Sequence, residues 1–449
     1  MIKNIVNDFS KLIFLEKTIF ILVLLLPFAL CLSIFVADLF TSIIALIVLF
    51  WFFKNKEFQQ IIRNIKKPLS VIILFYFLII ISLSFSVNFN KSFLASFFYF
   101  RYFFLSLAIF FLMHKYEFSL KIILFSLLSL MVLITVDSSI ELLKINNFFG
   151  LTLPSYRIET GSTYYLTSLF DDEKKLGSFI IRLLPFMISL LILYEIKFFK
   201  KIDVKFILLI LCGILIFFSS ERVAIFLFIF FLIFSLKIFK KKFFILFFFI
   251  FSLFTISIFQ PKLIDKYIPS TLTQFGILKT YTIYDKENKL KPFWNEMNFS
   301  NMNYLSEEHE KLIMSGIEIF KENPITGTGI KNYHRYCKNL KEKNSLDIKC
   351  SSHPHNTYVQ ILSDIGLFGA ITIFLIFMYF LLTNLKILFN KNQSNFLKSY
   401  FILNLGIMIN LMPFIPSGSF FNNWINIMIY YPIGFWFYLF YKLKKNNEH

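Results

Sequence analysis

Long, uninterrupted apolar runs are the feature of this sequence that most restricts its fold. A helix needs about 20 apolar residues to cross the roughly 30 Å of hydrocarbon in a bilayer. Runs of about that length recur along most of the chain, and we count about twelve. The expected spans are 18–37, 39–53, 69–87, 92–113, 119–137, 177–194, 205–219, 223–239, 243–259, 357–383, 398–416 and 424–441. The sequence therefore predicts an all-α polytopic membrane protein with about twelve transmembrane helices.

The positive charges predict the orientation of these helices. The net charge of +19 alone is compatible with a nucleic-acid partner, with anionic lipid or with a topology signal. The lysines and arginines gather in alternate connections, at 54–67, 197–205, 237–242, 386–398 and 442–445. Connections of this kind face the cytoplasm, so we expect both termini there. The charges form no single stripe, so we expect no nucleic-acid partner.

The connections on the other side of the membrane predict the domain organisation. Residues 138–176 form a first outer loop, and residues 260–356 form a larger one with short helices. The chain then divides into 1–259 with transmembrane helices 1–9, the large loop 260–356, and 357–449 with helices 10–12 and a cytoplasmic tail. The first apolar run has full length and lacks a small-residue cleavage site, so no cleavable signal peptide is expected.

The large outer loop contains an amphipathic stretch and two cysteines. The stretch, roughly 304–322, is expected to be a helix with one apolar face, formed by Leu305, Leu312, Ile313, Ile317 and Phe320. The run NPITGTG then ends this helix. Cys337 and Cys350 are separated by twelve residues in a compartment that this topology makes oxidising. We predict a disulfide between them, with two free thiols as the alternative.

The stretch HPHNTYVQ leads from this loop into the span expected at 357–383. Thr357 and Gln360 fit a capping box, which explains a helix start. A helix start does not require His353 or His355. A histidine at the mouth of a helix bundle suits a general base near neutral pH, with metal binding as a weaker alternative.

Several arginines are expected on the same side of the membrane. Arg222 lies in the tight outer turn SSER, and Arg182 lies about one and a half turns into a helix that begins outside. Arg157 lies in the first outer loop. An arginine near a membrane face usually has an anionic partner, and its planar fork suits phosphate oxygens. The alternative for Arg222 is a snorkelling charge or an ion pair with Glu221.

A histidine base, several arginines and a covering loop suit a reaction on a lipid phosphate or diphosphate. The arginines would bind the anionic leaving group, and the histidine would activate an attacking hydroxyl. The sequence has no Walker loop, and GTG at 327–329 lacks the strand and helix of a nucleotide site. The energy for transfer would therefore be stored in a lipid-linked donor. We expect no cofactor and no metal.

The order of the motifs resembles the O-antigen ligase and polymerase superfamily of bacterial inner membranes. His355 and Asn356 are followed after nine residues by Gly366, and Gly369 comes three positions later, as in the signature of that superfamily. Other motifs agree in order: RIETG at 157–161, FDDEKKLGSFIIRLLP after it, SSERVAIF around Arg222, the loop helix before the cysteines, and MPFIPSGSFFNNW at 412–424. The resemblance covers residues from about 90 to 441.

The resemblance implies a glycosyltransferase with a GT-C-type fold and a periplasmic active site. Members move a glycan from undecaprenyl diphosphate to an acceptor by an inverting, metal-independent reaction. The acceptor is lipid A core for ligases and a second repeat unit for polymerases, and HPHN with the cysteine pair favours a ligase. By resemblance His355 is the catalytic base, and Arg222 binds the diphosphate with help from Arg157 or Arg182. Membrane lipids and other envelope-assembly proteins are the further partners expected.

The sequence departs from the superfamily pattern in two places. Phe226 stands where many members have leucine, and His309 stands where many have an arginine in the loop helix. The second cationic residue that contacts the diphosphate is therefore Lys311, Arg335 or Arg182, and the sequence leaves the choice open. His353 and Asn356 are further candidate substrate contacts. Gly366 and Gly369 are expected on one helix face, where they would let a neighbouring helix approach closely.

Two other classes of function remain as alternatives. A polysaccharide or lipid transporter would line a through-going cavity with deep charges such as Arg101 and Asp364. The other reading of this pair is structural, with the two charges neutralising each other or other buried partners. Only the second half of the chain carries a large loop, which argues against a transporter built from duplicated halves. A scaffold in an envelope-assembly complex would tolerate substitution of the histidines and arginines.

Overall fold

The computed structural model describes residues 9, 12–143, 165–171, 173–194, 197–198, 202–239, 306–344, 347–390 and 393–446, with isolated residues at 251, 254, 272–273, 277–278 and 297–298. The described chain is helical except for loops and one antiparallel pair of short strands, β1 (Lys197–Phe198) and β2 (Ile202–Asp203). Seven of its helices are long and apolar enough to cross a membrane. The predicted all-α polytopic fold is confirmed.

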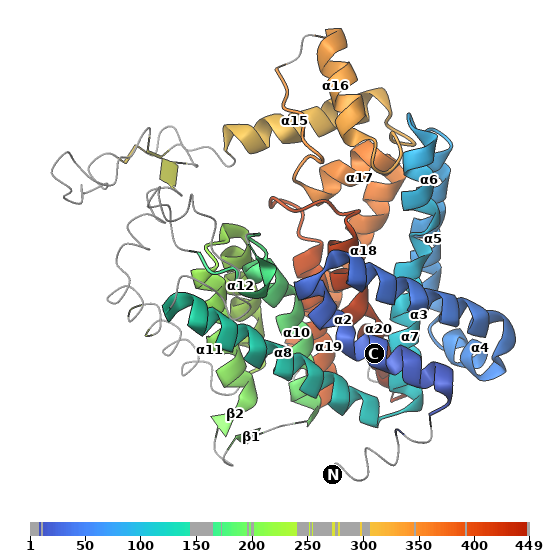
Figure 1. The fold of residues 1–449 in the computed structure, drawn as a ribbon, viewed down its shortest axis with the longest axis vertical. Helices are drawn as coiled ribbons and strands as arrows, with labels where there is room; N and C mark the ends of the chain where they lie inside the picture. Colours follow the sequence, from blue (N-terminus) through green and yellow to red (C-terminus); the bar gives the residue numbers. More distant parts are fainter. Residues whose placement is uncertain are drawn as a thin grey trace.

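The apolar helices follow the order expected from the apolar runs (Figure 1), except that the span expected at 92–113 is divided between α6 (Phe89–Phe97) and α7 (Phe100–Lys115). Before the large loop they are α2 (Phe14–Leu32), α3 (Ile34–Lys54), α5 (Lys66–Leu83), α6 (Phe89–Phe97), α7 (Phe100–Lys115), α8 (Phe118–Leu143), α10 (Leu176–Tyr194), α11 (Val204–Phe218) and α12 (Arg222–Ser235). After the loop they are α18 (Leu367–Phe389), α19 (Asn395–Asn410) and α20 (Asn423–Lys445). A short helix α4 (Lys56–Arg63) and a 3-10 turn η1 (Ser168–Phe170) complete this part. The span expected at 243–259 lies outside the described residues, and the division into domains stays a prediction.

Helix α10 lies in the middle of the bundle, packed against α19, α11, α12, α8 and α20. Its residues are buried almost all round, as expected for a helix that is apolar on every face. Small residues bring α19 close to it. A Cβ on Gly406 would lie 2.7 Å from the Cβ of Pro185, and the Ser189 and Ser399 hydroxyls are 2.6 Å apart. Close backbone approach of this kind holds membrane helices together.

The outer helices α15 (Glu307–Glu322), α16 (Tyr333–Asn344) and α17 (Thr357–Ile365) stand at one end of the bundle, at the top of Figure 1. They enclose a small core of their own, formed by Ile319, Tyr333, Cys337, Leu340 and Ile348. The predicted amphipathic helix corresponds to α15. Its buried residues are Leu312, Ser315, Gly316 and Ile319, whereas Ile313, Ile317 and Phe320 are half-buried and Leu305 lies outside the described residues.

The single helix expected at 357–383 is wrong, because the chain breaks at Gly366 into α17 and α18. Residues of the NPITGTG run enter the break. The amides of Thr328 and Gly329 donate to the carbonyls of Ser363 and Asp364, both at 2.9 Å, and the amide of Leu367 donates to Pro324 at 2.8 Å. These bonds satisfy the end of one helix and the start of the next, so the apolar run continues while the helix does not.

The expected face shared by Gly366 and Gly369 is therefore also wrong. Gly366 has a φ of 86°, a left-handed conformation that favours glycine. A Cβ at this position would overlap the carbonyl of Ile325. Gly369 lies one turn into α18, where a Cβ would lie 2.8 Å from Cγ2 of Ile365. Gly366 makes the helix junction, and Gly369 lets α17 fold back closely against α18.

Candidate active site

Three histidines from two parts of the outer segment gather before the start of α17. The rings of His353 and His355 stack with their centroids 4.1 Å apart. The ring of His309, from the first turn of α15, stands edge-on to His355 at 5.7 Å. The sequence singled out all three residues, and the structure brings them together. Among the described residues, no group of three or more His, Cys, Asp or Glu side chains is arranged to hold a metal ion.

Helix α15 supplies both a histidine and the surface on which the other two lie. Ser306 caps the helix and places its hydroxyl 2.8 Å from Nδ1 of His309. Further along, a Cβ on Gly316 would lie 3.1 Å from the Cβ of Pro354 and would overlap the side chain of Val359. The missing side chain at Gly316 therefore lets the HPH segment lie directly on α15.

His355 has a left-handed backbone with a φ of 54°. Such a conformation is uncommon for a residue with a side chain, and it often marks a functional position. Its carbonyl accepts a hydrogen bond from the amide of Ser417 at 2.8 Å, and the side chain of the next residue, Asn356, donates to the carbonyl of Pro413 at 2.8 Å. The outer turn between α19 and α20 thus holds the backbone that presents the imidazole.

The capping box expected from Thr357 and Gln360 is wrong, because Asn356 caps α17 instead. Its side-chain oxygen accepts hydrogen bonds from the amides of Tyr358 at 3.0 Å and Val359 at 3.1 Å. Gln360 instead bonds across to the last outer turn, and its Oε1 accepts from the amide of Phe420 at 2.8 Å. The sequence identified the helix start but not the residues that hold it.

The surroundings of the histidines favour their neutral forms. Burial lowers the pKa of His355, and the nearby charges of His309 and Lys349 lower it further. Burial, followed by the charge of His355, lowers the pKa of His353 to about 4. A neutral imidazole can accept a proton, so His355 is in the form that a general base requires at neutral pH.

Arg222 is the first residue of α12, directly after the predicted outer turn. The preceding residue, Glu221, reaches back to the start of α10, where its carboxylate accepts hydrogen bonds from the Gly177 amide at 2.6 Å and the Ser178 hydroxyl at 2.5 Å. Burial raises the pKa of Glu221, and the hydrogen bonds from Ser178 and Gly177 and the charge of Arg182 oppose that rise. Glu221 therefore fixes the turn that carries Arg222 onto α10.

Arg182 lies in α10, close to this turn. Its Nη1 donates to the carbonyl of Ser178 at 3.0 Å. Its Nε is buried and has no hydrogen-bond partner in the described part of the chain. A buried guanidinium nitrogen without an acceptor is costly, and an anionic ligand would supply the acceptor. Among the predicted second cations that the structure describes, Arg182 is thus the one with a buried donor left for an anionic group.

The arginine turn and the histidine cluster lie at the same end of the helix bundle. The ring of Phe179, near the start of α10, lies 6.2 Å from the ring of Trp424, near the start of α20. The turn before α20 bonds in turn to Gln360 and His355 on the other side. Figure 1 shows the starts of α10, α12 and α17 directed toward the same end. Whether Arg222 and His355 converge on one substrate stays a prediction.

The other predicted cations have different surroundings. Arg157 lies outside the described residues. The Nζ of Lys311 is 3.0 Å from carboxylate oxygens of both Glu307 and Asp347. Arg335 is exposed on α16. The structure therefore places Lys311 and Arg335 in the outer helices, with Lys311 already ion-paired.

Arg101 and Asp364 do not pair with each other: Arg101 forms an ion pair with an aspartate, and Asp364 accepts a hydrogen bond from a neutral glutamine. Nε of Arg101 lies 2.9 Å from Oδ1 of Asp38. Oδ2 of Asp364 accepts from the side chain of Gln360 at 3.2 Å. Burial raises the pKa of Asp364 to about 7, against the effects of Gln360 and of the charge of Lys331. Both contacts support the structural reading of these residues.

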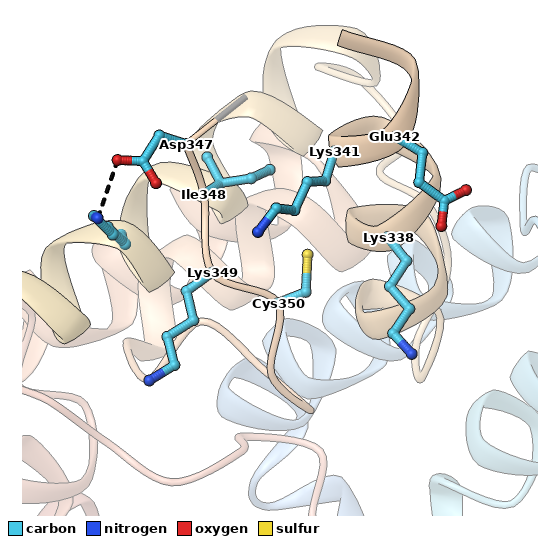
Figure 2. A pocket seen from close by; sticks show the side chains of 8 residues that line it. Lys338, Lys341, Glu342, Asp347, Ile348, Lys349 and Cys350 are labelled. Carbon is cyan, nitrogen blue, oxygen red and sulfur yellow. Dashed lines mark ion pairs between the residues drawn. The ribbon is translucent and has the colours of Figure 1, made fainter. Parts of the chain in front are cut away.

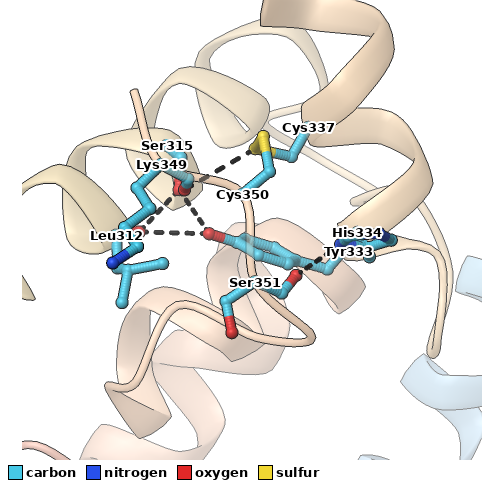
Figure 3. The surroundings of a disulfide bond; sticks show 8 residues. All are labelled: Leu312, Ser315, Tyr333, His334, Cys337, Lys349, Cys350 and Ser351. Carbon is cyan, nitrogen blue, oxygen red and sulfur yellow. Dashed lines mark hydrogen bonds between the residues drawn. A yellow bond between two sulfur atoms is a disulfide. The ribbon is translucent and has the colours of Figure 1, made fainter. Parts of the chain in front are cut away.

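The predicted disulfide between Cys337 and Cys350 is present, with the Cα atoms 5.7 Å apart (Figure 3). It joins α16 to the segment that leads, five residues later, to His355. Figure 3 shows Tyr333 beside this segment, and its hydroxyl donates to the carbonyl of Leu312 at 3.1 Å. The disulfide and Tyr333 together tie α15, α16 and the approach to the histidines into one unit.

Sequence reasoning missed two contributors to this region. Ser417 and the rest of the last outer turn hold the backbone of His355. Lys338 and Lys341 line a hollow beside the disulfide. Their spacing of three residues, which places them on one face of α16, was the available signal.

Comparison with known proteins supports the family assigned from the motifs. No curated protein matches the chain. Residues 207–374 match the model of a family described as O-antigen ligase. This range includes Arg222, all three clustered histidines, both disulfide cysteines and the glycines at the helix junction, whereas Arg157 and Arg182 precede it. The match supports the resemblance to the O-antigen ligase and polymerase superfamily over residues 207–374.

Proposed function

We propose that this protein is a ligase-like glycosyltransferase of the bacterial inner membrane. It moves a glycan from undecaprenyl diphosphate to a hydroxyl of lipid A core at the periplasmic face. The observation that carries the proposal is His355, a half-buried imidazole with a lowered pKa that is held in a left-handed backbone inside the matched family segment. Its position at the end of the bundle that also holds Arg222 and Arg182 supports a reaction on a lipid-linked anion.

In the proposed step, neutral His355 takes the proton of the acceptor hydroxyl as the hydroxyl oxygen attacks the anomeric carbon. The bond from that carbon to the diphosphate oxygen breaks with inversion, and the electron pair leaves with the diphosphate. Arg222 and Arg182 stabilise the leaving group, and the free Nε hydrogen of Arg182 supports this role. The histidine then releases its proton to water. In this proposal the arginines provide the neutralising charge, and no metal or cofactor takes part.

Reconstitution of the purified full-length protein in nanodiscs tests the proposal. The donor is an undecaprenyl diphosphate-linked repeat unit, and the acceptor is either lipid A core or a second lipid-linked repeat unit. We expect transfer to lipid A core. Transfer only to the second repeat unit would identify a polymerase, and transfer to neither would contradict the proposed function.

The variant His355→Ala tests the base. We expect it to abolish transfer while the protein remains inserted and folded, since His355 is only half-buried. His334→Ala is the matched control, because His334 is an exposed histidine on the same outer helices. Wild-type transfer by His355→Ala would show that this imidazole is not the base.

A further inference from the structure

A basic hollow of the outer segment lies beside the disulfide, between α15, α16 and residues 347–350 (Figure 2). Its volume is about 540 Å³. Four lysines line it, from three different stretches of chain: Lys311, Lys338, Lys341 and Lys349. Glu342 and Asp347 are the acidic residues of the lining, so its charge is net positive. A hollow of this size and sign fits an anionic group on a saccharide.

Two of the lysines are already neutralised within the outer helices. Lys311 is 3.0 Å from Asp347 and from Glu307, and Lys349 is 2.7 Å from Glu308. No carboxylate of the described residues lies within ion-pair distance of Lys338 or Lys341. Figure 2 shows Lys341 extending from α16 toward the segment that carries Ile348 and Cys350, with Lys338 directed away from that segment. Lys341 is therefore the charge that a bound anion would meet first, and Lys338 lines the hollow beside it.

Two stretches of chain lead from the hollow to the histidine cluster. Lys311 follows His309 by two residues on α15, and Cys350 precedes His355 by five residues. The disulfide fixes Cys350 to α16, which carries Lys338 and Lys341. A ligand in the hollow would thus be held on the α15–α16 side of the histidines, whereas Arg222 and Arg182 belong to the α10–α12 side.

We propose that this lysine hollow binds a phosphate or carboxylate group of the acceptor saccharide, so that the acceptor is an anionic glycan. The inference rests on the proposed glycosyl transfer and names the chemical class of its acceptor. The donor is tied to the bilayer by its lipid, whereas α16 stands at the end of the molecule away from the membrane helices (Figure 1). The same placement favours a saccharide over a lipid headgroup as the occupant.

The lysines of the hollow also include a neighbour of the proposed base. Lys349 lies near enough to His355 for its charge to act on the imidazole, after burial and the charge of His309. An anion in the hollow would therefore lie close to the proposed base.

Equilibrium binding to the full-length protein in nanodiscs tests the hollow without requiring transfer. The probes are phosphopentamannose and the same pentamannose after phosphatase treatment. We expect the phosphorylated probe to bind at least about tenfold more tightly and to weaken with added salt, as screened charge contacts do. The double variant Lys338→Gln, Lys341→Gln should lose this difference. Lys343→Gln should keep it, because Lys343 is exposed on the same helix but does not line the hollow.

The outcomes separate the two proposals. Equal binding of both probes to the wild-type protein, or an equal loss in Lys343→Gln, would overturn the lysine hollow whatever the transfer assay shows. Nanodiscs with and without phosphatidylglycerol show whether the hollow binds a lipid headgroup or a saccharide. Displacement of the probe by the anionic lipid would favour the headgroup.

In the transfer assay, the double variant should raise KM for a phosphorylated acceptor about tenfold and leave kcat and the donor KM unchanged. Absence of transfer by the wild-type protein with every acceptor would count against the proposed function alone.

Discussion

The arginine turn and the histidine cluster are built in different ways, although they lie at the same end of the bundle. The turn with Arg222 is held by Glu221 and Gly177, from neighbouring membrane helices in one stretch of chain. The histidine cluster needs α15, the HPH segment and the turn after α19, which are far apart in sequence. The first region thus depends on helix order, and the second on long-range packing. Substitutions far from His355 should therefore disturb the cluster more than comparable changes disturb the arginine turn.

The largest expected effect is on the junction that supports the cluster. Gly366→Ala forces a side chain into a left-handed conformation and against the carbonyl of Ile325. Strain and overpacking together should cost about 4 kcal/mol of stability. Thermal unfolding of the purified protein measures the loss. Gly369→Ala is the control, because its Cβ would meet only side-chain atoms of Ile365 and Ile361 and should cost about 1–2 kcal/mol. Similar losses in both variants would contradict the special role of the junction.

Removal of the disulfide should have the next largest effect and should separate the two regions. Replacing Cys337 and Cys350 by serine opens a link between residues 13 apart, which should cost about 3 kcal/mol. We expect faster proteolysis of the outer helices and slower transfer, because the link holds the approach to His355. Binding of the lipid-linked donor should persist, since Glu221 holds the arginine turn to the start of α10. Loss of donor binding would show that the two regions are not independent.

Substitution of Arg222, the arginine proposed to stabilise the leaving group, should lower the rate without unfolding the protein. Arg222→Gln should reduce kcat about a hundredfold, or about 2.7 kcal/mol in the transition state. Single-turnover transfer with the reconstituted enzyme measures this effect. Arg63→Gln is the control, because Arg63 is exposed on α4, within the charged stretch expected to face the cytoplasm. An unchanged kcat in Arg222→Gln would remove this residue from the reaction.

The smallest expected effect is on the pH dependence of transfer. In the proposed reaction neutral His355 is the active form, so the rate should fall when the pH drops below the pKa of His355. Burial is the largest cause that lowers this pKa, and the charge of His309 is the second. The enzyme should therefore stay active at a lower pH than it would with an unperturbed histidine. His309→Gln should therefore raise the pKa and move the acid limb of kcat/KM to higher pH. The rate above neutral pH should stay near that of the wild type. An acid limb that moves to lower pH would contradict this electrostatic coupling.

The sequence predicted the parts that follow from local composition and topology. Apolar runs of membrane length gave the described helices, because burying apolar surface in lipid does not depend on which neighbour covers it. The alternating charges predicted an oxidising compartment for Cys337 and Cys350, and the disulfide predicted on that basis is present in the structure. The turn with Arg222 was also predictable, because its position needs only two apolar runs and a short polar connection.

The tertiary structure decided the parts that depend on partners distant in sequence. The apolar run at 357–383 gives no sign of the break at Gly366, since the bonds that replace the helix come from Thr328 and Gly329. The grouping of His309 with His355 likewise depends on how α15 packs, with Gly316 allowing the close contact. A hydrophobic run records how favourable burial is at each residue, whereas these features arise from hydrogen bonds and contacts that form only when the chain is folded.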